Sequence, residues 1–246
     1  MSPASRRLSA GPTNLPRMAL AGWNGTICLQ GGGEFSAACA PMDADLLVRS
    51  GGPVVVTALA GAPGAEYAAA TANGVRHFRA LGATEVVASP DAREHPREAL
   101  AALRTARLLV LPGGSPSRLL DALRATGVKQ VIDELLAADG VVLGASAGAM
   151  VLCAWTVLPD RDLQVVEGMG VVPDAIVLPH WGAWPADRLR SIEAAVPAGT
   201  TVLGLPEQSG VLLADGQVTA VGVAPTALPT TGEVLTSRAS GGQIPA

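Results

Sequence analysis

A serine between two alanines and two glycines is the candidate nucleophile of this chain. Residues 141–150 read Val-Val-Leu-Gly-Ala-Ser-Ala-Gly-Ala-Met, so Ser146 lies in a G-x-S-x-G pattern between a short apolar strand and a predicted helix. This strand–turn–helix setting is typical of a nucleophile elbow. In such an elbow the turn forces the serine backbone into a cramped conformation and projects the serine hydroxyl above the sheet. Gly144 and Gly148 permit the close approach that such a turn requires. The alternative is a small-residue turn where a strand packs closely against a helix.

A nucleophilic serine needs a neighbouring base, and the chain contains three histidines. His77 lies in a predicted amphipathic helix beside Phe78, which favours a packing or surface residue. His95 lies in a charged segment that we expect to form a solvated loop. His180 directly follows a predicted buried strand, where the returning chain would bring it beside Ser146. We therefore predict that His180 is the base.

The base in turn needs an acid that holds its tautomer. Glu207 follows the next predicted strand in the segment Gly204-Leu-Pro-Glu207, and the end of a neighbouring strand is a suitable place for a carboxylate that contacts His180. Four other acidic residues lie between the serine and the histidine and stay open as rivals: Asp160, Asp162, Glu167 and Asp174.

Acyl transfer also needs N–H donors for the charge that develops on the attacked carbonyl oxygen. The backbone N–H of Ala147, directly after the candidate nucleophile, is one such donor. The turn Gly113-Gly114 can supply another, because a backbone without side chains can approach a substrate closely. The alternative role of the Gly113-Gly114 turn is to lead into a helix. We expect Ser115 to cap this helix and Pro116 to occupy its first position.

Strand-like and helix-like segments alternate along the chain. Predicted strands cover residues 26–30, 54–59, 85–88, 107–111, 141–143, 175–178 and 201–205, with helices over 65–81, 96–105, after 115, over 129–138 and over 186–195. This alternation predicts an α/β fold with a mostly parallel, doubly wound sheet and helices on both faces. A hairpin is expected over 210–221, turning at Asp215-Gly216. Because ligands bind at the carboxyl ends of strands in such sheets, the segments 31–34, 113–115, 145–148, 179–181 and 206–209 should converge along one edge.

Length and composition limit the organisation and the partners of the chain. Its 246 residues, 49% of them hydrophobic, suffice for one large core. We expect a single α/β hydrolytic domain over 23–225 and a disordered leader over 1–22, where prolines and arginines interrupt any signal-peptide core. The segment 226–246, rich in Ser, Gly and Pro, is expected to be loosely ordered. A monomer or a homodimer is expected.

Several function classes are disfavoured by the residue content. A net charge of −4 does not favour nucleic acid as a partner, and no apolar run is long enough to span a membrane. The three cysteines, an odd number without metal-like spacing, predict buried free thiols and a cytoplasmic location. The chain offers a single lysine, Lys129, for Schiff-base chemistry, and it lies on an ordinary helix face. We expect no metal and no cofactor.

Five segments together resemble the cyanophycinase and aspartyl dipeptidase family of serine peptidases, from about residue 26 to residue 223. The segments are Gly31-Gly32-Gly33-Glu34, Pro112-Gly113-Gly114, Gly144-Ala-Ser146-Ala-Gly148-Ala, Pro179-His180 and Gly204-Leu-Pro-Glu207. The resemblance implies a flavodoxin-like fold similar to class I glutamine amidotransferase domains. It implies that the substrate is a small peptide with an acidic N-terminal residue.

The same resemblance implies a role for each matching residue. Ser146 would be the nucleophile, His180 the base and Glu207 the acid of the triad. Gly114 and Ala147 would form the oxyanion hole. An aspartate between the serine and the histidine has also been considered in that family, so Asp160 and Asp162 stay open as the acid.

The chain departs from that family in two segments. Ser115 and Pro116 follow the two glycines where many members carry Asn and then Gln or Thr. The segment after the histidine reads Trp181-Gly-Ala-Trp184-Pro-Ala-Asp-Arg188, where members often carry Phe and a polar, Arg-containing loop. Arg188 could bind a substrate carboxylate, whereas two tryptophans favour an apolar pocket wall. The predicted substrate-binding residues are Gly113, Ser115, Trp181 and Arg188.

Three alternative functions require different residues or a different residue order. Ammonia release by an amidotransferase uses cysteine where this chain has Ser146. An α/β-hydrolase esterase has the order Ser, acid, His, whereas His180 follows Ser146 early and no histidine lies further on. A non-peptidase or non-catalytic small-molecule-binding protein of the same fold stays open, because sequence does not show the geometry of a triad.

Overall fold

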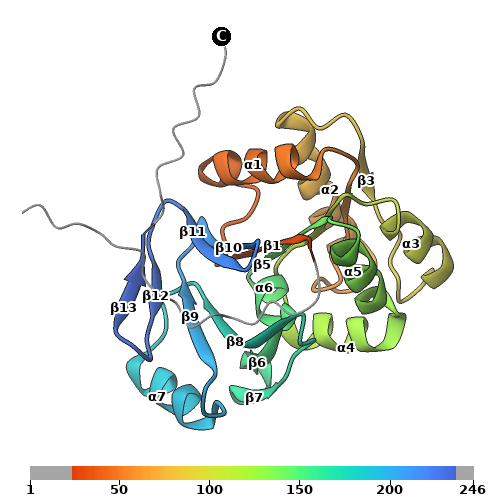
Figure 1. Cartoon of the computed structure of the whole chain (residues 1–246). Helices are drawn as coiled ribbons and strands as arrows, with labels where there is room; N and C mark the ends of the chain where they lie inside the picture. Colours follow the sequence, from red (N-terminus) through yellow and green to blue (C-terminus); the bar gives the residue numbers. More distant parts are fainter. Residues whose placement is uncertain (1–23, 237–246) are drawn as a thin grey trace, which may run out of the picture.

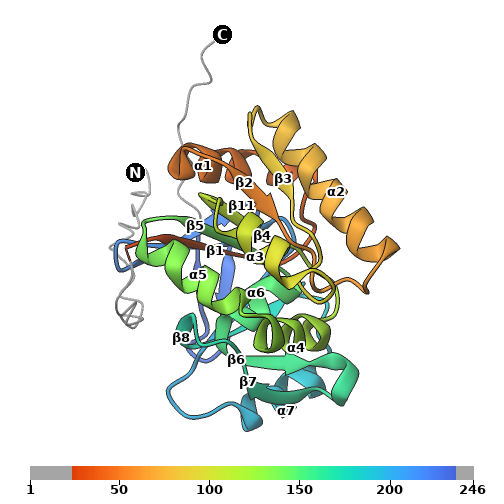
Figure 2. The same cartoon turned by 90° about the vertical axis from the view of Figure 1, so that its right-hand side faces the viewer.

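Five parallel strands make up most of the larger of two sheets (Figures 1 and 2). The structure, a computed structural model, describes residues 24–236. The strands lie in the order β1 (Thr26–Gln30), β5 (Val141–Ala145), β4 (Leu108–Leu111), β2 (Val54–Val56) and β3 (Val86–Ala88). The hairpin β10 (Ser209–Ala214) and β11 (Gln217–Gly222) extends the sheet antiparallel beyond β1. It turns at Asp215 and Gly216 as predicted, and both have positive φ angles, as a two-residue hairpin turn requires.

Helices cover both faces of this sheet, which confirms the predicted α/β class (Figure 2). On one face α1 (Ala40–Ser50) and α2 (Ala65–Ala80) pack against alternate strand residues such as Val54 and Val56. On the other face lie α3 (Pro96–Leu103), α4 (Pro116–Thr126), α5 (Val128–Ala137) and α6 (Ala147–Leu152). They pack against the intervening strand residues, among them Ile27, Leu29 and Val55. The alternation follows from the two-residue period of a strand.

A second sheet, which the sequence did not predict, carries part of the candidate site. Its order is β13 (Glu233–Leu235), β12 (Thr226–Leu228), β9 (Thr201–Leu205), β8 (Val172–Pro179), β6 (Cys153–Leu158) and β7 (Gln164–Glu167). The 3₁₀ turns η1 (Ala37–Cys39) and η2 (Pro159–Arg161) and the helix α7 (Ala186–Ala195) complete the described elements. The expectation that all the site segments follow strands of one sheet is therefore wrong. Strand periodicity identifies β8 and β9 but does not determine which strands they pair with.

The structure also differs from the expectation of a loosely ordered segment from residue 226. Strand β12 pairs antiparallel with β9, where Ala227 lies opposite Gly204, and β13 pairs with β12. Thr226 and Leu228 of β12 and Leu235 of β13 are buried, so burial of these side chains orders the hairpin. Residues 237–246, and the leader expected over 1–22, lie outside the described residues.

Cys28, Cys39 and Cys153 are free and buried, as predicted. None of the helices between residues 24 and 236 has the length and apolar character needed to cross a membrane.

Candidate active site

Ser146 lies at the sharp turn between β5 and α6 that its sequence pattern predicts. Its φ and ψ angles are 48° and −108°, a left-handed conformation that costs a non-glycine residue about 1–3 kcal/mol. Its backbone N–H donates to the carbonyl oxygen of Gln30 at the end of β1 (2.8 Å). A Cβ at Gly148 would lie 2.1 Å from the backbone oxygen of Leu111, so the helix after the serine can pack against β4 only with glycine there.

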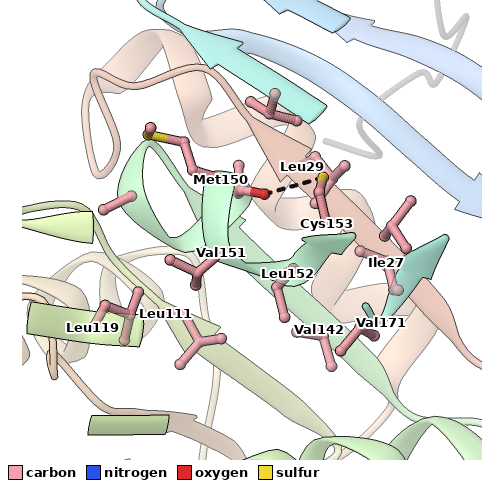
Figure 3. Packing of buried hydrophobic residues seen from close by; sticks show 14 of the residues in the cluster. Ile27, Leu29, Leu111, Leu119, Val142, Met150, Val151, Leu152, Cys153 and Val171 are labelled. Atoms are coloured by element: carbon pink, nitrogen blue, oxygen red, sulfur yellow. Dashed lines mark hydrogen bonds between the residues drawn. The ribbon is translucent and has the colours of Figure 1, made fainter. Parts of the chain in front are cut away.

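Packing of the short helix α6 holds this strained turn in place. All six residues of α6 are buried. Figure 3 shows Val151 and Leu152 among apolar side chains of the neighbouring strands and of α4, including Leu111 and Leu119. Cys153, directly after the helix, directs its thiol to the backbone oxygen of Ala149 (3.5 Å). Because each buried aliphatic side chain contributes about 1.5–3 kcal/mol, this packing can offset the strain at Ser146.

The three residues predicted as a triad lie in hydrogen-bonding contact. Ser146 Oγ is 3.0 Å from His180 Nε2, and His180 Nδ1 is 3.0 Å from Glu207 Oε1. One neutral tautomer satisfies both contacts: Nδ1–H donates to the carboxylate, and Nε2 accepts from the serine hydroxyl. The side chains of His180 and Glu207 are 42% and 60% exposed, so solvent screens the contact between them.

The glycine run after β1 joins the loops that carry the histidine and the glutamate. Gly31 accepts the backbone N–H of His180 (2.8 Å), and Gly32 accepts that of Gln208 (2.7 Å). Gly32 has a φ of 126°, and a Cβ there would lie 2.4 Å from Cε1 of the His180 ring. Only glycine therefore lets the main sheet approach the imidazole this closely.

Both tryptophans of the segment after His180 help to hold that loop. Trp181 donates its backbone N–H to Leu205 (3.0 Å), and its ring covers Gly204, where a Cβ would lie 2.4 Å from a ring carbon. Trp184 donates its indole N–H to the backbone oxygen of Pro179 (2.6 Å). These contacts connect the His180 loop to β8 and β9.

The Gly113-Gly114 turn lies against Ser146. The two backbone N–H groups of this turn differ in their hydrogen-bond partners. Gly113 donates its N–H to Glu34 Oε1 (2.8 Å). The N–H groups of Gly114 and Ala147 have no acceptor within the described part of the chain. Of the donors predicted from sequence, Gly114 and Ala147 thus keep an N–H group without an acceptor among the described residues.

Comparison with known proteins identifies the family. The sequence profile of peptidase family S51 matches residues 59–221 of the chain. The chain belongs to peptidase family S51. This confirms the resemblance inferred from its motifs.

Two curated relatives of this S51 chain are named Peptidase E, from Escherichia coli K12 and from Shigella boydii serotype 18. Each is 27% identical over 135 residues, which cover 49% of this chain and 57% of the relative. The match thus spans little more than half the length of these relatives.

Two solved structures resemble the S51 chain over most of its length. The first is a peptidase from an acI-B1 Actinobacterium, with a TM-score of 0.76 and 26% identity, covering 87% of this chain and 95% of that one. A putative Peptidase E from Listeria monocytogenes has a TM-score of 0.62 and 16% identity, covering 81% and 99%. The second likeness supports the fold alone.

None of the acidic rivals of Glu207 is a hydrogen-bond partner of His180 among the described residues. Asp160 accepts hydrogen bonds from the hydroxyls of Ser117 and Ser115, and the Ser117 bond is the main reason that its pKa lies below the ordinary value. Within residues 24–236, His180 has no hydrogen bond to Asp160, Asp162, Glu167 or Asp174.

The predicted substrate-binding residues differ in how close they lie to Ser146 and His180. Gly113 and Ser115 lie in the turn beside the nucleophile, and Trp181 follows the candidate base. The Ser115 hydroxyl also caps α4 by accepting the N–H of Arg118 (3.2 Å), as predicted. Arg188 lies exposed in the first turn of α7, and its side chain has no hydrogen bond or ion pair to any described residue.

The loop after β2 accepts hydrogen bonds from the segment that follows the Gly113-Gly114 turn. Ala60 accepts the N–H of Ser115 (3.0 Å) and a guanidinium N–H of Arg118 (2.8 Å). Arg93 donates to the backbone oxygen of Gly61 in the same loop (2.9 Å) and pairs with Asp91 (2.6 Å). Sequence reasoning missed this arrangement, because residues distant along the chain build it.

Replacing Asp91 with asparagine should lower the free energy of unfolding in a pH-dependent way. Burial alone would raise the pKa of Asp91, but its bonds to Arg93 outweigh burial and hold the pKa below the ordinary value of 3.8. A carboxylate with a lowered folded-state pKa stabilises the fold above the unfolded pKa, and this stability is lost as pH falls through the folded one. We expect a loss of about 1.5–3 kcal/mol at pH 7, the range for hydrogen bonds to charged groups.

Urea unfolding of wild type and Asp91→Asn at pH 7 and at pH 3 measures this difference, which should shrink at the lower pH. Asp139→Asn is the matched control, because Asp139 is exposed and asparagine tolerates its positive φ of 58°. A loss of equal size at both pH values would exclude the charge of Asp91 as its cause.

Proposed function

We propose that the chain is a serine-type peptidase that hydrolyses small peptides through Ser146, His180 and Glu207. Membership of peptidase family S51 and the likeness to the acI-B1 peptidase support this reaction class. The observation that carries the residue assignment is the continuous pair of 3.0 Å contacts from the serine through the histidine to the glutamate.

Each group has a defined part in the proposed reaction. Ser146 Oγ attacks the peptide carbonyl carbon while its proton passes to His180 Nε2. The carbonyl oxygen becomes an oxyanion that accepts from the N–H groups of Ala147 and Gly114. His180 then gives the proton to the leaving nitrogen, and the C–N bond breaks to leave an acyl-enzyme. Water hydrolyses this ester with His180 again acting as the base, while Glu207 stabilises the imidazolium.

Labelling with a fluorophosphonate, followed by peptide mapping, tests this proposal. An activated serine attacks the phosphorus atom and displaces fluoride, so a single label on Ser146 is expected. Absence of the label, or a label on another residue, would contradict the assignment and favour a non-catalytic binding protein of the same fold. Denatured protein is the control, because the serine is activated only by its folded surroundings.

The family resemblance extends the proposal to peptides with an acidic N-terminal residue, for which Arg188 is the candidate carboxylate ligand. Arg188→Ala should then raise KM for Asp-Leu about tenfold and leave Ala-Leu and Phe-Leu unchanged, because a charged hydrogen bond contributes about 1.5–3 kcal/mol and exposure reduces it. Arg190→Ala, an exposed arginine on the same helix, is the control. A preference for Ala-Leu or Phe-Leu, or no response to Arg188→Ala, would exclude aspartyl specificity.

A further inference from the structure

A glutamate beside the candidate nucleophile has no part in the proposed triad. Glu34 follows the glycine run at the end of β1, and its carboxylate reaches the Gly113-Gly114 turn. The partner residue is 79 positions away in the sequence, so sequence patterns gave no sign of this contact.

The carboxylate and the serine hydroxyl lie on the same side of Gly113. A Cβ built on Gly113 would be 2.8 Å from Glu34 Oε1, 3.0 Å from Ser146 Cβ and 3.5 Å from Ser146 Oγ. One small side chain at Gly113 would thus contact both groups. A substrate carbonyl held over Ser146 would therefore lie close to the carboxylate of Glu34.

Only one oxygen of this carboxylate has a partner among the described residues. Oε1 accepts the N–H of Gly113, whereas Oε2 has no hydrogen bond and Glu34 forms no ion pair within residues 24–236. The side chain is half-buried. A partly buried carboxylate without a cationic partner favours binding a cation, because the charged hydrogen bond replaces the hydration free energy that the carboxylate loses on burial.

We propose that Glu34 binds the free α-ammonium group of the peptide substrate and so restricts the site to the N-terminal residue of unblocked peptides. This inference rests on the proposed peptidase function. In a peptide the α-nitrogen is two bonds from the carbonyl carbon of the same residue, about 2.5 Å away. The serine oxygen attacks that carbon from about 3–3.5 Å. An ammonium group bound to the Glu34 carboxylate is therefore within reach of a carbonyl carbon held over Ser146.

The charge of Glu34 separates this role from a merely structural one. If Glu34 only held the Gly113-Gly114 turn, glutamine would serve equally well, because its amide oxygen also accepts an N–H. If Glu34 binds an ammonium group, glutamine removes the charge that distinguishes a free N-terminus. Glu34→Gln is therefore more informative than an alanine variant, which would change both properties at once.

The test compares substrates that differ only in the amine. Ala-Leu is matched with propionyl-Leu, and Asp-Leu with succinyl-Leu, and kcat/KM is measured from leucine release at pH 7, where the α-amine is mostly protonated. Wild type should favour the amine-bearing member of each pair. Glu34→Gln should reduce that preference on the order of 10-fold to 100-fold, the effect of losing one charged hydrogen bond. Glu98→Gln, an exposed glutamate on α3, should keep the wild-type preference.

Two results would overturn the inference. One is wild type that cleaves propionyl-Leu as fast as Ala-Leu and succinyl-Leu as fast as Asp-Leu; the other is an unchanged preference in Glu34→Gln. Either result together with a fluorophosphonate label on Ser146 would refute the role of Glu34 alone and leave the peptidase proposal intact. Failure of the label and of all peptide cleavage would instead refute the peptidase proposal and with it the role of Glu34.

Discussion

Replacing Ser146 with alanine is expected to abolish hydrolysis of small peptides, with a loss in kcat on the order of 10⁴-fold or more. In the proposed reaction the serine oxygen forms the covalent bond to the substrate, and no other group can take its place at the turn between β5 and α6. The remaining activity would come from substrate binding and from the oxyanion donors. The measurement is kcat for the best-cleaved dipeptide, together with fluorophosphonate labelling of the variant.

This loss should not come from unfolding. Alanine keeps the backbone conformation of the turn, and all six residues of α6 stay buried. We therefore expect the thermal unfolding midpoint to change little, because active-site residues are often not optimal for stability. Ser191→Ala is the control, since Ser191 lies exposed on α7 and bonds only to its own helix. A Ser146→Ala protein that still takes the label elsewhere and still cleaves the peptide would refute the assignment.

Local patterns predicted the elements that carry the site. The strands β1 and β9 and the helix α7 have the predicted bounds, and the hairpin turns where Asp215-Gly216 indicated. The turn at Ser146 was predictable because a strained serine between a strand and a helix requires glycines at fixed positions. These features depend on residues that are close together in the sequence.

What the sequence did not predict depends on contacts between distant residues. The second sheet forms because β6 pairs in parallel with β8, and β8 with β9, and no local period determines such pairing. The glutamate at position 34 was visible as part of a glycine-rich motif, but its bond to Gly113 was not.

His77 gives another example of a distant partner. The sequence predicted a packing or surface residue, and the structure bonds His77 to the buried Asp43 of α1 (2.7 Å), a helix that the sequence analysis did not identify. Burial raises the pKa of Asp43, and the bond from His77 opposes that rise. The helical pattern of α2 could show which face carries the histidine but not which residue faces it.

Replacing His180 with alanine should cost about as much activity as losing Ser146, because the members of a triad act as a unit. Without the imidazole the serine proton has no acceptor at 3.0 Å, and the leaving nitrogen has no proton donor. Glu207→Gln should cost less, on the order of 10²-fold, because in the proposed reaction the carboxylate orients the ring and stabilises its charged form without reacting itself. Its 60% exposure favours the lower end of the range for triad acids, since solvent already screens the pair.

The order of these losses identifies the acid. Asp160→Asn is the matched comparison, because it also changes a carboxylate to an amide, and Asp160 bonds to Ser115 and Ser117 rather than to the histidine. We expect kcat of Asp160→Asn to stay within severalfold of wild type. If Asp160→Asn or Asp162→Asn lost activity while Glu207→Gln kept it, the acid would lie between the serine and the histidine. The 3.0 Å contact between Glu207 and His180 would then hold the loop after β9 and take no part in proton transfer.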